Sequence, residues 1–249
     1  MKAMIFAAGL GTRLRPITDS MPKALVRVGG TPMLERVILS LKASGIDSFV
    51  VNVHHYADMI VSFLEENNNF GVQIDISREE EQALETGGGI RHAAPFLRGS
   101  GRFLVYNVDI LSDLNLKQLQ KCDSTASLAT LVLAPARDPR RLLFDSSMRL
   151  RGWTDLRSGL VRGVPEESEL TSLLQYSFTG IHILSEKALD MMDSYPKAFS
   201  IRDFYLDVAK DHLIRGVLMD NLHYIDIGSI ETLERANAAL SCPRGVEAL

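Results

Sequence analysis

The sequence predicts an α/β fold, a three-layer sandwich built on a mixed, mostly parallel central sheet. Up to residue 134, short apolar segments alternate with amphipathic helical segments, which is the pattern of parallel strands joined by helices. After Pro135 the apolar segments are shorter and are separated by turns, which indicates added antiparallel strands. The chain has 249 residues, of which 46% are hydrophobic, so it is long enough to bury one large core.

Each element of the first half follows from its apolar spacing. The helix over 31–45 has Thr31 as its expected N-cap, Pro32 as its first residue and Gly45 as its stop. The other predicted elements are strands at 3–7, 48–53, 72–77, 102–109 and 126–133, and helices at 57–66 and about 115–121. Asp113 is the expected cap of the helix near 115.

The second half reads as an elaboration of the first. We expect strands at 141–145, 148–153, 159–163, 176–184, 215–220 and 223–228, and helices at about 185–193, 201–211 and 229–240. Ser229 is the expected cap of the last helix. The sequence therefore predicts one domain over 1–240, with a first half of about 1–134, an elaboration of about 135–228 and a frayed tail at 241–249.

Charge and cysteine content exclude several classes of protein. The net charge of −4 argues against a general nucleic-acid binder, which is normally basic. The first apolar run breaks at Gly9, so it is neither a signal peptide nor a membrane span. Cys122 and Cys242 lie far apart without a CxxC pattern, which fits two thiols in a reducing compartment. We expect a cytoplasmic protein with no nucleic-acid or membrane partner.

The loop after the first predicted strand is a candidate phosphate site. It leaves the strand at its carboxyl end, where open α/β sheets bind ligands. Gly9 and Gly11 let backbone N–H groups approach a ligand, and such groups form anion-binding concavities. Arg13, Arg15 and Lys23 add positive charge, and polyphosphate is the ligand that explains all these residues. A surface turn with solvated arginines is the alternative.

Known phosphate loops do not match this one. The chain lacks GxxxxGK[ST], and Leu14 stands where a dinucleotide-binding GxGxxG motif has its third glycine. The second strand is followed by His54 and His55 rather than by the acid that binds a ribose. A hydride-transfer enzyme is therefore disfavoured.

Two further features point to the same ligand. The stretch LETGGGI (84–90) places three glycines before a short predicted helix, which suggests backbone close to a flat or anionic ligand, or else a flexible turn. Asp109 and Asp226 each follow or end a predicted strand. Two carboxylates beside phosphate would hold Mg²⁺, although each Asp alone is also a common turn residue.

Together, AAGLGTRLRPIT, PKAL, LETGGGI, NVD and YIDIG resemble the signature of the sugar-1-phosphate nucleotidyltransferases, the nucleoside-diphosphate-sugar pyrophosphorylases. The resemblance covers nearly the whole chain. Within the family it is most similar to the N-acetylmuramate-1-phosphate uridylyltransferases, and the mannose-1-phosphate guanylyltransferases are the alternative. It implies a Rossmann-like, glycosyltransferase-A-like sandwich whose first half binds nucleotide and whose second half binds sugar.

The resemblance also implies roles for single residues. Arg13 would bind the β and γ phosphates of the NTP, Lys23 would neutralise the reacting phosphates, and Asp109 and Asp226 would bind Mg²⁺. The nucleotide pocket would be lined, largely through backbone groups, by Ala8, Gly9, Gly11, Thr12, Glu85 and Gly88. The sugar phosphate is already an anionic nucleophile, so no general base is required, and the histidines are expected to be structural or on the surface.

The sequence departs from the family pattern at two places. Val108 replaces the glycine of the usual NGD or DGD, and the Glu-Lys-Pro motif whose lysine binds the sugar phosphate is missing. Arg151, Arg157 and Arg162 are the candidate substitutes for this lysine. The same three residues and Arg202 are the candidates for binding a lactyl carboxylate, or they are solvated surface residues.

The alternatives differ in testable ways. UTP is the favoured nucleotide and N-acetylmuramate 1-phosphate the favoured acceptor, with GTP and mannose 1-phosphate as the alternative pair. A non-catalytic nucleotide-sensing or assembly subunit on the same fold is the alternative of another class, and its expected loss of key charges is not seen. The sequence leaves the oligomeric state open, including a homo-oligomer.

Overall fold

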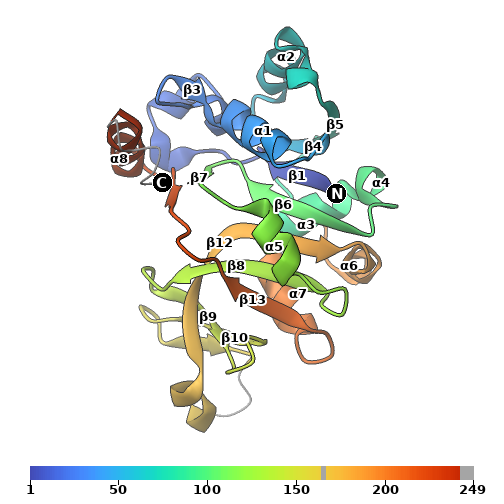
Figure 1. The fold of residues 1–249 in the computed structure, drawn as a ribbon, viewed down its shortest axis with the longest axis vertical. Helices are drawn as coiled ribbons and strands as arrows, with labels where there is room; N and C mark the ends of the chain where they lie inside the picture. Colours follow the sequence, from blue (N-terminus) through green and yellow to red (C-terminus); the bar gives the residue numbers. More distant parts are fainter. Residues whose placement is uncertain (164–166, 242–249) are drawn as a thin grey trace.

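A computed structural model of the chain describes residues 1–163 and 167–241. Helices cover both faces of one large mixed sheet, so the predicted three-layer α/β sandwich is confirmed (Figure 1). Of the predicted tail, Ser241 ends the last helix, and the remaining residues, with Cys242, lie outside the described residues.

The main sheet brings together strands from both halves of the chain. Within the described residues it has ten strands: β1 (Lys2–Phe6), β4 (Ser48–Val53), β5 (Gln73–Arg78), β6 (Arg102–Asn107), β8 (Ala129–Pro135), β9 (Arg140–Phe144), β10 (Leu150–Asp155), β11 (Leu160–Arg162), β12 (Leu174–Ser185) and β13 (Ile214–Leu218). β5, β4, β1 and β6 run parallel in this order, so their carboxyl ends share one edge. The long strand β12 pairs antiparallel with β6, β8 and β9 and thereby joins the two halves.

Two small sheets complete the strand pairing among the described residues. β2 (Arg27–Val28) pairs with β3 (Thr31–Pro32), and β7 (Ile110–Ser112) pairs with β14 (Tyr224–Asp226). The second pair matters for the site, because it brings the end of the chain back beside the residues that follow β6.

The helices divide between the two faces of the sheet. One hydrophobic cluster joins the sheet to α1 (Met33–Ala43), α2 (Ala57–Glu66), α5 (Leu116–Cys122) and α8 (Ile230–Ser241). The other joins it to α3 (Glu85–His92), α4 (Ala94–Leu97), α6 (Lys187–Met191) and α7 (Ile201–Val208). The connections between parallel strands thus bury apolar faces on both sides, as the alternating sequence pattern predicts.

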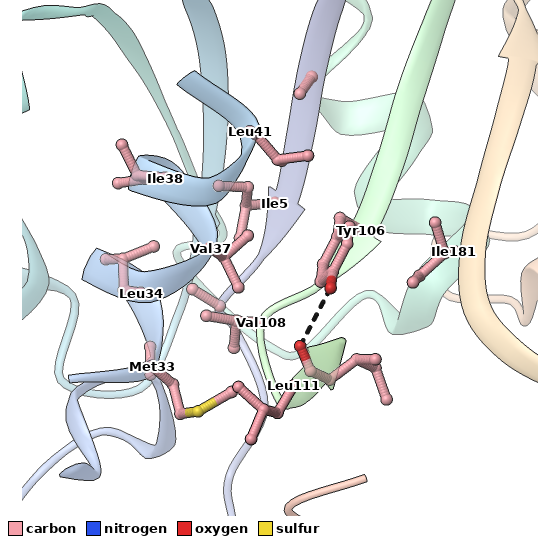
Figure 2. Close-up of a cluster of buried hydrophobic side chains, with 14 of the residues drawn as sticks. Ile5, Met33, Leu34, Val37, Ile38, Leu41, Tyr106, Val108, Leu111 and Ile181 are labelled. Carbon is pink, nitrogen blue, oxygen red and sulfur yellow. Dashed lines mark hydrogen bonds between the residues drawn. The ribbon is translucent and has the colours of Figure 1, made fainter. Parts of the chain in front are cut away.

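α1 packs against β1 and β6 through a cluster of buried apolar side chains (Figure 2). Leu34, Val37, Ile38 and Leu41 are buried on one face of the helix, and each contributes about 1.5–3 kcal/mol by leaving water. In the same cluster, the hydroxyl of Tyr106 on β6 donates to Ile110 O at 3.2 Å, and it shares a 2.7 Å hydrogen bond with Ser112 Oγ. Burial raises the pKa of this phenol. These bonds fix the turn after β6.

Several local predictions are corrected by the structure. Pro32, not Thr31, is the N-cap of α1, because Thr31 pairs with Val28 in the small β2–β3 sheet. Gly45 does end the helix, with a φ of 95°.

Two other predicted caps have different outcomes. Asn115 caps α5 by accepting a hydrogen bond from Gln118 N at 3.0 Å, whereas the Asp113 carboxylate accepts one from His223 N at 2.9 Å. The predicted Asp113 cap is therefore wrong, because the backbone of the returning chain uses its carboxylate. Ser229 Oγ accepts from Thr232 N at 3.3 Å, as expected of the cap of α8.

Candidate active site

A cavity of about 430 Å³ opens at the shared carboxyl edge of β5, β4, β1 and β6. Its walls come from the ends of all four strands and from the loops that follow them. Its lining residues are Phe6–Arg13, Lys23, Asn52, Glu79, Ala83, Glu85, Thr86, Asn107–Asp109 and Gly228. This is the edge where an open α/β sheet binds ligands. Seven of the eight predicted nucleotide- and phosphate-binding residues line the cavity: Ala8, Gly9, Gly11, Thr12, Arg13, Lys23 and Glu85. Gly88 is not among the lining residues.

The loop after β1 is folded tightly around Gly11. Gly11 has a φ of 64°, and its carbonyl accepts hydrogen bonds from Leu14 N and Thr18 Oγ1, both at 2.8 Å. A Cβ at this position would lie 2.9 Å from Thr18 Cγ2 and 3.2 Å from Lys23 Cβ, so only glycine allows this packing. The closed turn brings both Arg13 and Lys23 into the lining of this cavity.

Lys23 and Asp109, which both line the cavity, form an ion pair. Their side chains retain 12% and 23% of their exposure, so the pair is half-buried and less screened than a surface pair. Asp109 lies in the two-residue turn between β6 and β7, and the Tyr106 hydrogen bonds fix this turn. The sequence placed this Asp at a strand end, but nothing in the sequence pattern indicated its pairing with Lys23.

Asp226 lies beside Asp109 because β14 pairs with β7. Asp226 is aligned with Ile110, and Ile227 N donates to Asp109 O at 2.8 Å. Burial raises the pKa of Asp226, and the Asp109 carboxylate adds to the rise, while Lys23 and Arg13 oppose it. Two carboxylates separated by 117 positions of sequence, from 109 to 226, thus share one electrostatic environment with two cations.

Arg13 lies where this cavity meets a second one. It lines both, and Asp226 lines the second. A Cβ at Gly228 would lie 2.7 Å from the Arg13 guanidinium and 2.9 Å from Asp226 Oδ1, so the glycine leaves room for the approach of the two side chains. A molecule in the second cavity would therefore meet a molecule in the first at Arg13 and Asp226.

The second cavity has a volume of about 270 Å³ and is built largely by the elaborated half of the chain. It is lined by Arg13, Asp138, Arg140, Leu142, Trp153, Ser177, Phe178, Arg202, Tyr205 and Asp226. The Arg202 guanidinium lies 4.6 Å from the centre of the Trp153 ring, a cation–π contact, and its Nη2 donates to Asp203 Oδ1 at 3.1 Å.

The four candidate arginines are placed differently. Among the described residues that line the second cavity, Arg202 is the one member of this set. Arg157 lies on the surface beside Asp155, and Arg162 Nη1 pairs with Asp203 Oδ1 at 2.7 Å. Arg151 lies on β10 and is not among the lining residues. Arg140, which the sequence analysis did not select, does line the cavity.

The three glycines of LETGGGI lie inside α3 rather than before it. The amides of Gly87 and Gly88 donate to Phe199 O at 2.8 and 3.2 Å, so they are already used within the protein. A Cβ at Gly88 would lie 2.6 Å from Lys197 O. The physical reason for glycine here is the close approach of another chain segment, and the contact of Gly88 with a base stays a prediction.

Glu85 begins α3 at the edge of the first cavity and has a φ of 59°, a conformation unusual for a residue with a side chain. Such strain is found where the surroundings hold a residue in place, often in a binding site.

Sequence reasoning missed several lining residues at the carboxyl ends of strands. Asn52 is the penultimate residue of β4, and Glu79 directly follows β5. Asn52 Nδ2 donates to Glu79 Oε1 at 2.9 Å, and Leu84 N donates to Glu79 Oε2 at 2.8 Å, so both buried side chains are fixed. Their position at the carboxyl ends of parallel strands was the available signal. Asn107, which ends β6, carries the same signal.

The histidines are placed as expected of structural or surface residues. His182 is buried on β12, and burial lowers its pKa to about 3. His223 Nδ1 lies 3.0 Å from Asp113 Oδ2, outside both cavities. His54 Nδ1 makes a 2.8 Å hydrogen bond with Glu79 O.

Comparison with known proteins gives a consistent result. Residues 2–241 match the family described as nucleotidyl transferase. The chain belongs to this family. It is 33% identical to the N-acetylmuramate alpha-1-phosphate uridylyltransferase of Caulobacter vibrioides, over 96% of each chain. It is also 29% identical to the mannose-1-phosphate guanyltransferase of Candida albicans, over 88% of this chain and 60% of that protein.

Solved structures agree on the fold. An apo UDP-glucose pyrophosphorylase aligns over the full length of both chains with a TM-score of 0.79 at 16% identity. A thymidylyltransferase-like protein of Bacillus anthracis, described as a putative glucose-1-phosphate thymidylyltransferase, aligns over 96% of this chain and 94% of its own with a TM-score of 0.79 at 23% identity. The family and its members place this chain among the sugar-1-phosphate nucleotidyltransferases, whose substrates are a nucleoside triphosphate and a sugar 1-phosphate.

Across residues 1–163 and 167–241, no helix combines the length and the apolar character needed to cross a bilayer.

Proposed function

We propose that the chain transfers a uridylyl group from UTP to N-acetylmuramate 1-phosphate, giving a UDP-sugar and pyrophosphate in a Mg²⁺-dependent reaction. The observation that carries the reaction is the meeting of two cavities at Arg13 and Asp226, beside Lys23 and Asp109. The identity of 33% over 96% of each chain to a uridylyltransferase of the same sugar supports the choice of substrates.

The first cavity suits the nucleotide. Its phosphate end would be the Gly11 turn with Arg13 and Lys23, and its base end would be the region of Asn52, Glu79 and Glu85. Arg13 and Lys23 supply the positive charge that a triphosphate requires. Because nucleotidyl transfer needs mainly positioning and charge stabilisation, no covalent role for a side chain is required.

The second cavity suits the sugar 1-phosphate. Its phosphate oxygen would attack the α-phosphorus of UTP from the side of Arg13 and Asp226, and pyrophosphate would leave toward the Gly11 turn. The P–O bond to the β-phosphate breaks as the new P–O bond forms, and no proton transfer is needed because the attacking oxygen is already anionic. Arg202, held over Trp153, is the proposed partner of the lactyl carboxylate of N-acetylmuramate.

The donor set fits Mg²⁺. Asp109 and Asp226 are two carboxylates beside the proposed phosphate site, a donor type that Mg²⁺ prefers. Burial, followed by the Asp109 carboxylate, raises the pKa of Asp226, and a bound cation would oppose this rise. Asp109 and Asp226 would hold the ion, which neutralises charge on phosphate oxygens when bound. Lys23 balances Asp109 in the protein itself.

The continuous main sheet supports the proposal that 1–240 acts as one catalytic domain, with the nucleotide bound by about 1–134 and the sugar by about 135–228. We also propose a cytoplasmic location, where nucleotides are available. A GTP-dependent mannose-1-phosphate guanylyltransferase is the second candidate, favoured by the similarity to the Candida albicans enzyme.

The test is pyrophosphate release from a small panel of nucleoside triphosphates and sugar 1-phosphates, with Mg²⁺ and with excess chelator. The proposal expects release with UTP and N-acetylmuramate 1-phosphate that chelator abolishes. Binding of a nucleotide without release from any pair would instead support the nucleotide-sensing subunit.

A further inference from the structure

Several backbone carbonyl groups beside α3 accept hydrogen bonds from one arginine side chain. Arg91, in the last turn of α3, donates to the carbonyl oxygens of Met192, Tyr195, Pro196 and Lys197 at 2.6–3.2 Å. Its guanidinium also lies 5.4 Å from the centre of the Phe199 ring. We call residues 195–201 the docked segment.

Glycines of α3 donate hydrogen bonds to this segment and leave the space in which it packs. Phe199 O accepts from the amides of Gly87 and Gly88, and Phe199 N donates to Leu84 O at 3.2 Å. A Cβ at Gly87 would lie 2.3 Å from the Phe199 ring, and one at Gly88 would lie 2.6 Å from Lys197 O. Gly87 and Gly88 are therefore matched to the docked segment, because side chains at these two positions would push the segment away, whereas a Cβ at Gly89 would lie 2.9 Å from Phe6 and 3.0 Å from Glu79 Oε1.

The docked segment leads directly to a residue of the second cavity, which we call the acceptor cavity because the proposed function places the sugar 1-phosphate there. Its last residue, Ile201, begins α7, and Ile201 N donates to Thr86 Oγ1 at 3.0 Å. The next residue is Arg202, which lines the second cavity and lies over Trp153. The start of α3 lines the first cavity through Glu85 and Thr86. The position of Arg202 thus depends on how the segment sits against α3.

We infer, on the basis of the proposed function, that LETGGGIR (84–91) is a docking surface that positions α7 and holds Arg202 in the acceptor cavity. Arg91 is a positioning residue in this arrangement, because it touches neither cavity. The triple glycine then bears on the choice of the sugar phosphate rather than on the choice of the base. Substitution in this surface should raise the KM for the sugar 1-phosphate while leaving the affinity for UTP unchanged.

The first test replaces Arg91 by Met, which keeps the apolar stem and removes the donors. Steady-state kinetics use the sugar 1-phosphate that the wild-type protein turns over fastest, and UTP affinity is measured by calorimetry without acceptor. Loss of the charge-assisted bonds should raise the acceptor KM about tenfold, with kcat changed less than about threefold and UTP affinity within about twofold. Arg91→Lys keeps a cation and should recover part of the acceptor KM.

A second variant separates the two interpretations of the glycines. Gly88→Ala introduces a Cβ at 2.6 Å from Lys197 O and should also raise the acceptor KM with UTP affinity unchanged. If Gly88 reads the base, this variant should instead weaken UTP binding and leave the acceptor KM intact, which would overturn the inference.

The matched control is Gly216→Ala on β13, where a Cβ would lie 2.4 Å from Leu133 Cδ1 and 2.8 Å from the Phe144 ring. Neither neighbour belongs to the docked segment or lines the second cavity. It should lower the melting temperature without raising the acceptor KM. An acceptor KM raised equally by this control would mean general loosening of the fold and would also overturn the inference. Failure of the proposed function would appear in the wild-type substrate panel, whereas failure of this inference would appear only in the variants.

Discussion

Replacing Lys23 by Met removes one positive charge from the lining of the first cavity. The Lys23 and Asp109 side chains retain only 12% and 23% of their exposure, so water screens the pair poorly. At an effective dielectric constant of about 20, a unit charge about 4 Å from a phosphate oxygen contributes about 4 kcal/mol. Only the part that grows toward the transition state accelerates the reaction, and loss of one such stabiliser costs about 10²–10³ in turnover.

We therefore expect Lys23→Met to lower kcat about 10²–10³-fold while raising the KM for UTP less than about tenfold. The assay is pyrophosphate release at saturating Mg²⁺ with both substrates varied. Lys23→Arg, which keeps the charge on a longer and planar group, is the control and should retain more activity. A kcat within about fivefold of wild type, or a loss confined to KM, would refute the role given to Lys23.

Three further predictions concern the proposed metal ligands, the proposed triphosphate contact and a buried histidine. Asp109→Asn and Asp226→Asn should each lower turnover at least about 10²-fold with the fold intact, and normal turnover at saturating Mg²⁺ in either variant would remove that residue from the metal site. Arg13→Ala should mainly raise the KM for UTP, because the β and γ phosphates are held before reaction as well as during it, and a loss in kcat alone would exchange its role with that of Lys23. Burial lowers the pKa of His182 to about 3. The unfolded chain therefore takes up a proton at this residue below about pH 6.5, whereas the folded chain does not. Because of this group, the free energy of unfolding should fall by about 2 kcal/mol between pH 7.5 and pH 5. Urea unfolding of His182→Leu at both pH values should show a smaller difference than wild type, and an equal difference would contradict the assignment.

Sequence alone predicted the fold and selected the glycine-rich loop that lines the first cavity. Alternation of strands and helices, and a glycine-rich loop at a strand end, are local patterns that tertiary structure preserves. Asp109 and Asp226 were candidates for the same reason, since both stand at strand ends. Their meeting depends on the pairing of β14 with β7, which no local pattern reveals.

Other features could not be resolved from local patterns. A glycine has the same local meaning whether it approaches a ligand or another segment of the chain, so the sequence did not reveal the packing of Gly88 on Lys197, and the contact of Gly88 with a base stays a prediction. Surface arginines also look alike in sequence. Arg202 and Arg140 were distinguishable from Arg157 only once the strands of the second half were folded around Trp153.

The most direct test of the proposed function is a competition in which UTP and GTP are offered together with N-acetylmuramate 1-phosphate or with mannose 1-phosphate. The nucleotide sugars formed are separated and quantified, so that the ratio of kcat/KM values is obtained for each pair. We expect UDP-N-acetylmuramate to be the dominant product. Faster formation of GDP-mannose would contradict the account and would make the guanylyltransferase the correct function.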